Sequence, residues 1–236
     1  MIRAGVLGIA ILAAACGGGD DGTLEVFAAS SLQDALPALE GPRYTFAGSD
    51  ALARQIREGA EADVFAAASP TVAQALFDDG LLTGPRVFAG NRLVLVVPRD
   101  NEARIHGLRD LGRDGVRVVL GDQGVPAGDY AREAIAAAGA GDVLDNVVSL
   151  EDDVKGVVAK VALGEADAGF VYATDARAAA DDLTVVELPA AVLPDVRYVV
   201  GVVTGRDRGA EAEAFVERLV SAEGRAALRQ AGFEAP

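Results

Sequence analysis

The sequence predicts an α/β protein of two lobes, each built on a mostly parallel sheet flanked by helices. Short apolar runs rich in β-branched residues alternate with segments of helical periodicity along nearly the whole chain, a pattern typical of sheets covered by helices. Two longer apolar runs, 94–97 and 199–203, are candidates for strands that connect the lobes. We therefore expect residues 24–97 and 198–236 to form lobe 1 and residues 98–197 to form lobe 2.

The first strand is predicted within the run L-E-V-F-A-A-S-S-L, residues 24–32. Its apolar residues lead into two alanines and two hydroxyls, Ser30 and Ser31, and then into a segment of helical period that stops at Gly41-Pro42. In open α/β sheets, ligands lie outside the carboxyl ends of strands, where helix N-termini present free N–H groups. Either serine is also an ordinary helix N-cap, so this stretch alone does not indicate a binding site.

The later elements follow the same alternation. Further strands are predicted at 43–46, 62–68, 91–98, 116–120, 147–150, 168–172, 185–188 and 198–203. Helices are predicted at about 52–59, 70–80, 129–138, 154–161, 173–180 and 210–219, with a last one ending at 231. Pro70 suits a first helical position and Gly139 a helix end. His106 falls in a polar, loop-rich segment, and we expect it to lie at the surface.

The composition argues against several classes of function. The 236 residues carry a formal net charge of −15, whereas a protein that binds nucleic acid needs a basic face. A single histidine and a single cysteine leave almost no material for a metal cluster, a histidine-based triad or an internal disulfide. The acidity does not exclude a small anion, since local backbone dipoles can bind one whatever the total charge.

The N-terminal residues have the features of an export signal. A basic residue precedes an apolar run, 6–15, that is too short for an ordinary membrane span and ends in L-A-A-A-C at Cys16. We expect residues 1–15 to be a lipoprotein signal peptide, Cys16 to be lipidated, and residues 16–23 to be a flexible tether. A plain secretory signal with a coincidental cysteine is the alternative. Lipidation would hold the protein on the outer side of the cytoplasmic membrane.

Neutral hydrogen-bond donors gather at the ends of the predicted strands. They are the hydroxyls of Ser30, Ser31, Ser49 and Tyr172, and the N–H groups of the turn at 125–128 and of the helix start at Val154. Donors without acceptors suit a fully ionised oxyanion, whose oxygens carry no protons. Such an anion is costly to bury unless its oxygens are hydrogen-bonded. We expect no catalytic residue and no cofactor, since no histidine lies near a hydroxyl.

Five separated segments resemble the molybdate-binding proteins of bacterial ABC transporters. They read V-F-A-A-S-S-L, G-S-D-A-L-A-R-Q-I-R-E-G-A-E-A-D-V-F, G-D-Q-G-V-P-A-G-D-Y-A, E-D-D-V-K and G-E-A-D-A-G-F-V-Y-A-T-D-A, in the family's order, within residues 24–233. The resemblance implies the two-lobed type II periplasmic-binding-protein fold, in which an oxyanion is held between the lobes by hydrogen bonds alone. It also implies delivery of the anion to the permease subunit of an ABC importer. We expect the protein to be a monomer.

The resemblance further implies which groups contact the anion. They are the hydroxyls of Ser31, Ser49 and Tyr172 and the backbone N–H groups of Ala127 and Val154. These groups would contact the oxygens of the metal's oxyanion and would not coordinate a bare cation. Ser30 stands where relatives usually carry alanine, so we expect it to take no part.

The chain departs from the family pattern at two places. Asp50 follows Ser49, where relatives commonly have a hydroxyl or a glycine. If the Asp50 carboxylate faces the cleft, it would repel a dianion, although it would supply the acceptor that a protonated phosphate needs. The position of Asp50 in the first turn of a helix favours a carboxylate that points to solvent. The segment between Leu39 and Arg43 is shorter than usual, which we expect to leave the site unchanged.

Three alternatives to molybdate transport stay open from the residues alone. The first is binding of another tetrahedral oxyanion, sulfate or phosphate. Sulfate is smaller than molybdate and tungstate, so a rigid pocket can distinguish it from them. Molybdate and tungstate are nearly equal in size, so we expect both to bind. The second is an enzyme acting on a phosphorylated or sulfated small molecule, for which only Asp50 and Asp129 are placed as a base. The third is a module that senses the ion and meets a membrane partner other than a permease.

Overall fold

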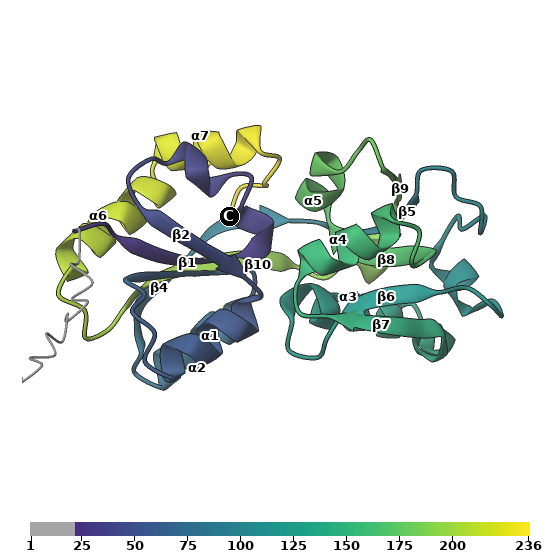
Figure 1. Ribbon diagram of the computed structural model, residues 1–236, viewed down its shortest axis with the longest axis horizontal. Helices are drawn as coiled ribbons and strands as arrows, with labels where there is room; N and C mark the ends of the chain where they lie inside the picture. The colour runs from purple at the N-terminus through teal and green to yellow at the C-terminus, as the bar shows by residue number, and fades with distance from the viewer. Residues whose placement is uncertain (1–21) are drawn as a thin grey trace, which may run out of the picture.

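A computed structural model describes residues 22–236, in which ten strands form two five-stranded sheets, one in each of two lobes (Figure 1). The lobe 1 sheet has the order β2-β1-β3-β10-β4, and the lobe 2 sheet the order β7-β6-β8-β5-β9. The strands of lobe 1 are β1 (Glu25–Ala29), β2 (Arg43–Ala47), β3 (Val64–Ala67), β4 (Leu82–Asn91) and β10 (Val196–Val203). Those of lobe 2 are β5 (Leu93–Pro98), β6 (Val118–Gly121), β7 (Val147–Glu151), β8 (Ala168–Tyr172) and β9 (Leu183–Val186).

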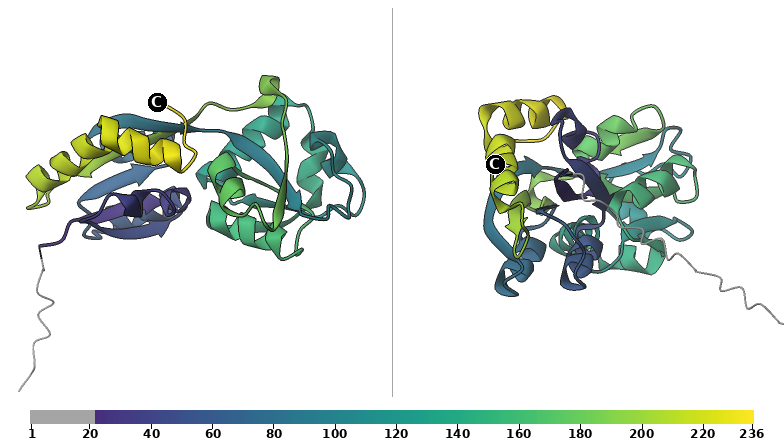
Figure 2. Two further views of the ribbon diagram at one scale, coloured as in Figure 1. Left: turned by 90° about the horizontal axis from the view of Figure 1, so that it is seen from above. Right: turned by 60° about the vertical axis from the view of Figure 1, so that its left-hand side comes forward.

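Helices cover both faces of the lobe 1 sheet. In Figure 1, α1 and α2 lie below this sheet and α6 and α7 above it, and Figure 2 shows the two lobes side by side. The helices of lobe 1 are α1 (Ser49–Arg57), α2 (Pro70–Asp78), α6 (Gly209–Val220) and α7 (Ala222–Gln230), with 3₁₀ turns η1 (Ser30–Leu32) and η2 (Leu36–Ala38). Those of lobe 2 are α3 (Pro126–Ala137), α4 (Val154–Ala162) and α5 (Ala173–Ala178), with 3₁₀ turns η3 (Leu108–Gly112), η4 (Gly141–Asn146) and η5 (Ala190–Val192).

Each sheet is mixed, whereas the sequence predicts mostly parallel sheets. In lobe 1, β1 pairs in parallel with β2 and β3, while β10 is antiparallel to β3 and β4. In lobe 2, β6 pairs in parallel with β7 and β8, while β5 is antiparallel to β8 and β9. The parallel halves contain the strand–helix–strand units visible in the sequence. The antiparallel pairs come from the strands next to the connections between the lobes.

The chain crosses from lobe 1 to lobe 2 between Asn91 and Leu93, because β4 ends in one sheet and β5 begins in the other. The expected boundary after residue 97 lies six residues beyond Asn91, at the far end of β5. The run 94–97 is buried because it is a central strand of lobe 2, and the polar pair Asn91-Arg92 marks the crossing. The chain returns before Val196, the first residue of β10, so the second expected boundary, at 197/198, differs by two residues.

Two elements differ from the sequence prediction for reasons of backbone chemistry. The predicted helix after β1 consists of the two short turns η1 and η2, because Pro37 interrupts the helical pattern. The sequence does not predict strand β4 before its last residue, because Gly84 and Pro85 break its apolar pattern. It is an edge strand of the lobe 1 sheet, where proline is tolerated.

The expected signal peptide (1–15), Cys16 and most of the tether at 16–23 lie outside the described residues. Among residues 22–236, no helix combines the length and the apolar character required to cross a membrane.

Candidate functional site

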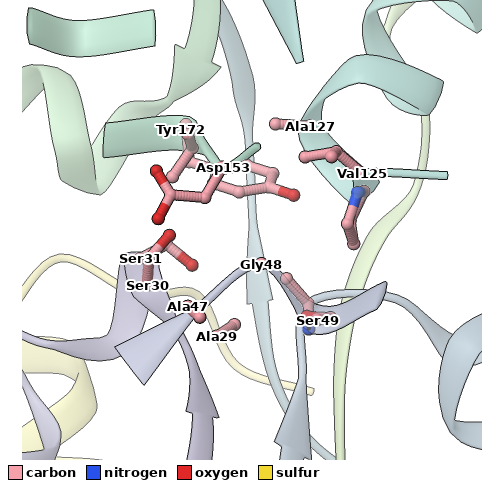
Figure 3. Close-up of a pocket in the computed structure, with 13 residues that line it drawn as sticks. Ala29, Ser30, Ser31, Ala47, Gly48, Ser49, Val125, Ala127, Asp153 and Tyr172 are labelled. Atoms are coloured by element: carbon pink, nitrogen blue, oxygen red, sulfur yellow. Dashed lines mark hydrogen bonds between the residues drawn. The ribbon is translucent and has the colours of Figure 1, made fainter. Parts of the chain in front are cut away.

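Strand ends and helix starts from both lobes meet at one small cavity (Figure 3). The empty space between its walls, counted out to the open mouth, is about 210 Å³. Lobe 1 lines it with Ala29, Ser30, Ser31, Ala47, Gly48, Ser49 and Ala68, and lobe 2 with Val125, Pro126, Ala127, Asp153, Val154 and Tyr172. The structure therefore brings all five predicted contact residues to one place, together with Ser30. In the described part of the chain, no lysine or arginine is among its lining residues.

Ser31 lies in η1, the turn that directly follows β1, and is buried. Its Oγ is 2.8 Å from the hydroxyl of Tyr198, a fully buried residue of β10. That hydroxyl also accepts a hydrogen bond of 3.4 Å from Nδ2 of Asn91, at the crossing between the lobes. Ser31 is thus anchored to residues behind the cavity wall.

Ser49 is the first residue of α1, and its side chain faces the end of β3. Its Oγ accepts a hydrogen bond of 3.0 Å from the backbone N–H of Ala68. A serine hydroxyl has one proton and two lone pairs, so this contact leaves the proton of Ser49 free to be donated. The first turn of α1 adds the positive end of a helix dipole at the same point.

Tyr172 ends β8, and its hydroxyl is buried with no hydrogen-bond partner in the described chain. Its ring makes edge contacts with Tyr198 and Tyr130, at centroid distances of 5.8 and 6.5 Å. Burial, and then the neighbouring tyrosines, raise the pKa of Tyr172 well above its ordinary value, so the phenol stays protonated. An unpaired buried donor of this kind costs stability, and a bound acceptor would remove that cost.

Ala127 and Val154 lie in the first turns of α3 and α4. N–H groups in the first turn have no acceptor within their own helix, and they lie at the positive end of its dipole. Pro126 places α3 so that it begins at the cavity, as expected for proline at a first helical position. Two helix N-termini of lobe 2 therefore face the two serines of lobe 1.

Asp153 also lines the cavity, and reasoning from the sequence did not single it out. Its Oδ1 accepts a hydrogen bond of 3.0 Å from the N–H of Gly156, so it is the N-cap of α4. Figure 3 shows its carboxylate on the same side of the cavity as Ser31. An acidic residue directly before a predicted helix start is the signal that could have identified it. It gives the wall one hydrogen-bond acceptor.

Asp50 and Asp129, the carboxylates required by the enzyme alternative, do not line this cavity. They line an adjacent groove that also contains Arg54 and Tyr130. Asp50 lies 3.9 Å from Arg54, one turn along α1, and its Oδ1 is buried without a hydrogen bond. Oδ1 of Asp129 accepts a hydrogen bond of 3.0 Å from the N–H of Gly124. His106 lines a separate groove of lobe 2 that shares no residue with the cavity.

The lobes are in close contact beside the cavity. A Cβ added to Gly48 would lie 2.4 Å from the backbone oxygen of Asp152, in the other lobe. Nζ of Lys155, on α4, lies 2.8 Å from a carboxylate oxygen of Asp34 in lobe 1 and 2.9 Å from one of Asp175. Bound solute would therefore be enclosed by both lobes.

A cation-binding cluster is absent from residues 22–236, since no three His, Cys, Asp or Glu side chains there are grouped as a metal ion requires. The chemistry of the cavity is instead that of hydroxyl and N–H donors. These can hold oxygens that carry negative charge and no proton.

Comparisons with known proteins agree with this geometry. The sequence profile described as "Bacterial extracellular solute-binding protein" matches residues 42–234. The molybdate-binding protein ModA of Mycobacterium tuberculosis (strain ATCC 25618 / H37Rv) is 37% identical over 225 residues, covering 91% of this chain and 85% of that protein. YvgL of Bacillus subtilis (strain 168), named an ABC transporter substrate-binding lipoprotein, is 31% identical over 226 residues, covering 90% of this chain and 86% of that protein.

A solved structure has the same architecture. The periplasmic molybdate-binding protein of Azotobacter vinelandii matches with a TM-score of 0.78 at 20% identity, over 90% of this chain and 99% of that one. At this identity the likeness concerns the fold alone. It confirms the predicted two-lobed type II periplasmic-binding-protein fold.

Proposed function

The chain belongs to the bacterial extracellular solute-binding proteins, and from this we propose that it captures molybdate, binds tungstate as well, and delivers the anion to the permease of an ABC importer. The observation that carries the proposal is the buried hydroxyl of Tyr172, which lacks a partner in a cavity where other neutral donors converge. The hydroxyl of Tyr172 finds no acceptor among the residues that line the cavity. An oxygen of a bound tetrahedral dianion would accept its hydrogen bond.

The anion would be held without a counter-charge from the protein. The hydroxyls of Ser31, Ser49 and Tyr172 and the N–H groups of Ala127 and Val154 each have a proton to donate. The N-termini of α1, α3 and α4 add dipoles that favour negative charge. Because donors come from both lobes, a bound anion would hold the lobes together, as in hinge closure of a two-domain binding protein.

Phosphate is the second candidate because of one observation, the carboxylate of Asp153 in the cavity wall. Near neutral pH phosphate carries a proton and requires an acceptor. One oxygen of Asp153 is already bonded to the N–H of Gly156, and the other is available to a ligand. Against phosphate, a carboxylate in the wall disfavours any anion that does not donate a hydrogen bond to it. Sulfate presents the same charge as molybdate on a smaller ion, so its hydrogen bonds would be stretched.

We infer that the protein is a binding protein and not an enzyme. This is supported by the family and by the positions of Asp50 and Asp129, which line the adjacent groove and not the cavity. An ion-sensing role with a different membrane partner would use the same cavity. The test between the two roles is whether the anion-loaded protein binds the permease of a reconstituted transporter. Binding supports transport, and its absence favours sensing.

The proposal includes an extracytoplasmic location with a lipid anchor at Cys16, and a monomeric state. It is supported by the lipobox-like run that ends at Cys16 and by the similarity to a relative named a lipoprotein. Metabolic labelling with a fatty-acid analogue should mark the wild-type protein and not Cys16→Ser. Label on both proteins would contradict lipidation at this cysteine. Light scattering of the purified protein tests the monomer.

Titration calorimetry of the purified protein tests the ligand. We expect tight binding of molybdate and tungstate and much weaker binding of sulfate and phosphate, at one pH and ionic strength. Sulfate or phosphate affinity equal to that of molybdate would overturn the assignment.

A further inference from the structure

We propose that Tyr198 is a positioning residue for anion recognition: its hydroxyl donates to Ser31 and so directs the Ser31 proton into the cavity. This rests on the proposed function and extends it to a residue that does not line the cavity. The inference depends on a chain of buried hydrogen bonds whose direction can be worked out step by step.

The direction begins at Asn91, where the chain crosses between the lobes. The side-chain oxygen of Asn91 accepts a hydrogen bond of 2.9 Å from the N–H of Arg92. This contact fixes the orientation of the amide, because only the oxygen can accept. Nδ2 then faces Tyr198 and Thr174, and donates to their hydroxyl oxygens at 3.4 and 2.9 Å.

The hydroxyl of Tyr198 therefore already accepts one hydrogen bond. It keeps its own proton, because burial raises the pKa of Tyr198 well above its ordinary value. The acceptor within reach is Oγ of Ser31, at 2.8 Å. If Ser31 donated to Tyr198 instead, the phenol proton would face no acceptor among the contacts of the described chain. In the favoured arrangement Asn91 donates to Tyr198, and Tyr198 donates to Ser31.

This arrangement leaves the proton of Ser31 for the cavity. Ser49 has an equivalent arrangement through a different group, since its Oγ accepts from the N–H of Ala68. The Oγ of each serine therefore accepts a hydrogen bond from a group inside the protein. Each hydroxyl keeps its proton to donate to a ligand in the cavity. A fully ionised oxyanion benefits from this, whereas an anion that must itself donate a proton finds fewer acceptors. Tyr198 thus contributes to discrimination between molybdate and phosphate.

Tyr198→Phe tests the inference while preserving most packing. The ring makes edge contacts with Phe88, Tyr172 and Phe233, at centroid distances of 6.1, 5.8 and 5.3 Å, and phenylalanine retains them. We expect molybdate affinity to fall roughly three- to tenfold, the range expected for one hydrogen bond between neutral groups. The ratio of phosphate affinity to molybdate affinity should rise, because Ser31 regains a free acceptor position.

A double-variant cycle separates positioning from a general structural role. In a Ser31→Ala background, Tyr198→Phe should change molybdate affinity by less than about twofold, because its effect passes through Ser31. The matched control is Tyr44→Phe, which removes a tyrosine hydroxyl bonded to the backbone oxygen of Leu39, 2.7 Å away and outside the cavity. It should leave both affinities unchanged.

The inference is overturned if Tyr198→Phe leaves molybdate affinity and the anion ratio unchanged, or if its effect is the same with and without Ser31. A wild-type protein that binds no molybdate would instead contradict the proposed function. A neutron structure of the wild-type protein gives an independent result should the variant not fold. Deuterium on Tyr198 pointing to Oγ of Ser31 supports the inference, and deuterium on Ser31 pointing to Tyr198 overturns it.

Discussion

At the scale of a single residue, the hydroxyl of Tyr172 affects both the stability of the ligand-free protein and its affinity for the anion. It is buried and unpaired in the ligand-free chain, which costs stability, and it faces the cavity, where an anion would pair it. Tyr172→Phe should therefore leave the melting temperature of the ligand-free protein unchanged or raise it. It should weaken molybdate binding by roughly 1–3 kcal/mol. Melting and calorimetry on the same samples give both values; a lower melting temperature with unchanged affinity would show that the hydroxyl is structural.

Ser49 should behave differently, because its oxygen has a structural partner as well. Ser49→Ala removes a donor to the anion and leaves the buried N–H of Ala68 without its acceptor. We expect a loss of roughly 1–3 kcal/mol in molybdate affinity together with a lower melting temperature before ligand is added. Ser149→Ala is the control, since Ser149 bonds to Glu151 outside the cavity. Equal affinities for the wild type and Ser49→Ala would remove Ser49 from the site.

At the scale of elements, Gly48, directly before helix α1, approaches lobe 2 closely. Gly48 has φ −57° and ψ 137°, angles that alanine adopts readily, so glycine is required there for space. Gly48→Ala would put a methyl group 2.4 Å from the backbone oxygen of Asp152 and force the lobes apart. We expect molybdate binding to be weakened by roughly 1–3 kcal/mol, as for overpacking.

The control for this variant is Gly209→Ala at the start of α6, where an added Cβ meets nothing within 4 Å. X-ray scattering with and without molybdate measures the expected difference in closure. If Gly48→Ala binds and compacts like the wild type, contact between the lobes at Gly48 is not needed for binding.

Elements with strong local signals could be predicted from the sequence, and those determined by other parts of the fold could not. The valine periodicity predicts helix α4, and a continuous apolar run predicts strand β8. Strand β4 contains Gly84 and Pro85, so only its place at the sheet edge makes it a strand. Leu32, Leu36 and Leu39 are buried as their spacing predicts, yet Pro37 prevents the helix.

The same division applies to the site. The hydroxyls at strand ends could be predicted because their local sequence places them beside helix starts. Tyr198 and Asn91 could not be connected to Ser31, since the contacts join residues 167 and 107 positions apart in the chain. The orientation of Asp50 also depends on packing, because the sequence alone allows its carboxylate to face either the cleft or the solvent.

At the scale of the whole molecule, Lys155 links the lobes through Asp34 and also pairs with the buried Asp175. Burial raises the pKa of the Asp175 carboxyl, and the Lys155 ammonium partly offsets this. A carboxyl whose folded pKa is raised binds more protons in the folded state, so its contribution to stability falls as pH rises above its ordinary value of 3.8. Without Lys155, the decrease in the free energy of unfolding with rising pH should be larger.

Lys155→Met should accordingly lower the free energy of unfolding at pH 7 by roughly 1–3 kcal/mol, because a buried carboxylate loses its partner. The difference from the wild type should shrink as pH is lowered toward 4, because the raised pKa of Asp175 favours its protonation as the pH falls. Urea unfolding across this pH range is the measurement. Lys160→Met, which breaks an exposed pair with Glu165, should have little effect at any pH. A loss that does not vary with pH would contradict this account of Asp175.

The central claim is that neutral donors from both lobes hold the anion, and a crystal structure of the molybdate complex tests it most directly. The anomalous signal of molybdenum locates the ion without ambiguity. The account predicts the ion in the cavity of Figure 3, with oxygens at hydrogen-bond distance from the hydroxyls of Ser31, Ser49 and Tyr172 and from the N–H groups of Ala127 and Val154. Molybdenum held elsewhere, or by a lysine or arginine side chain, would contradict it.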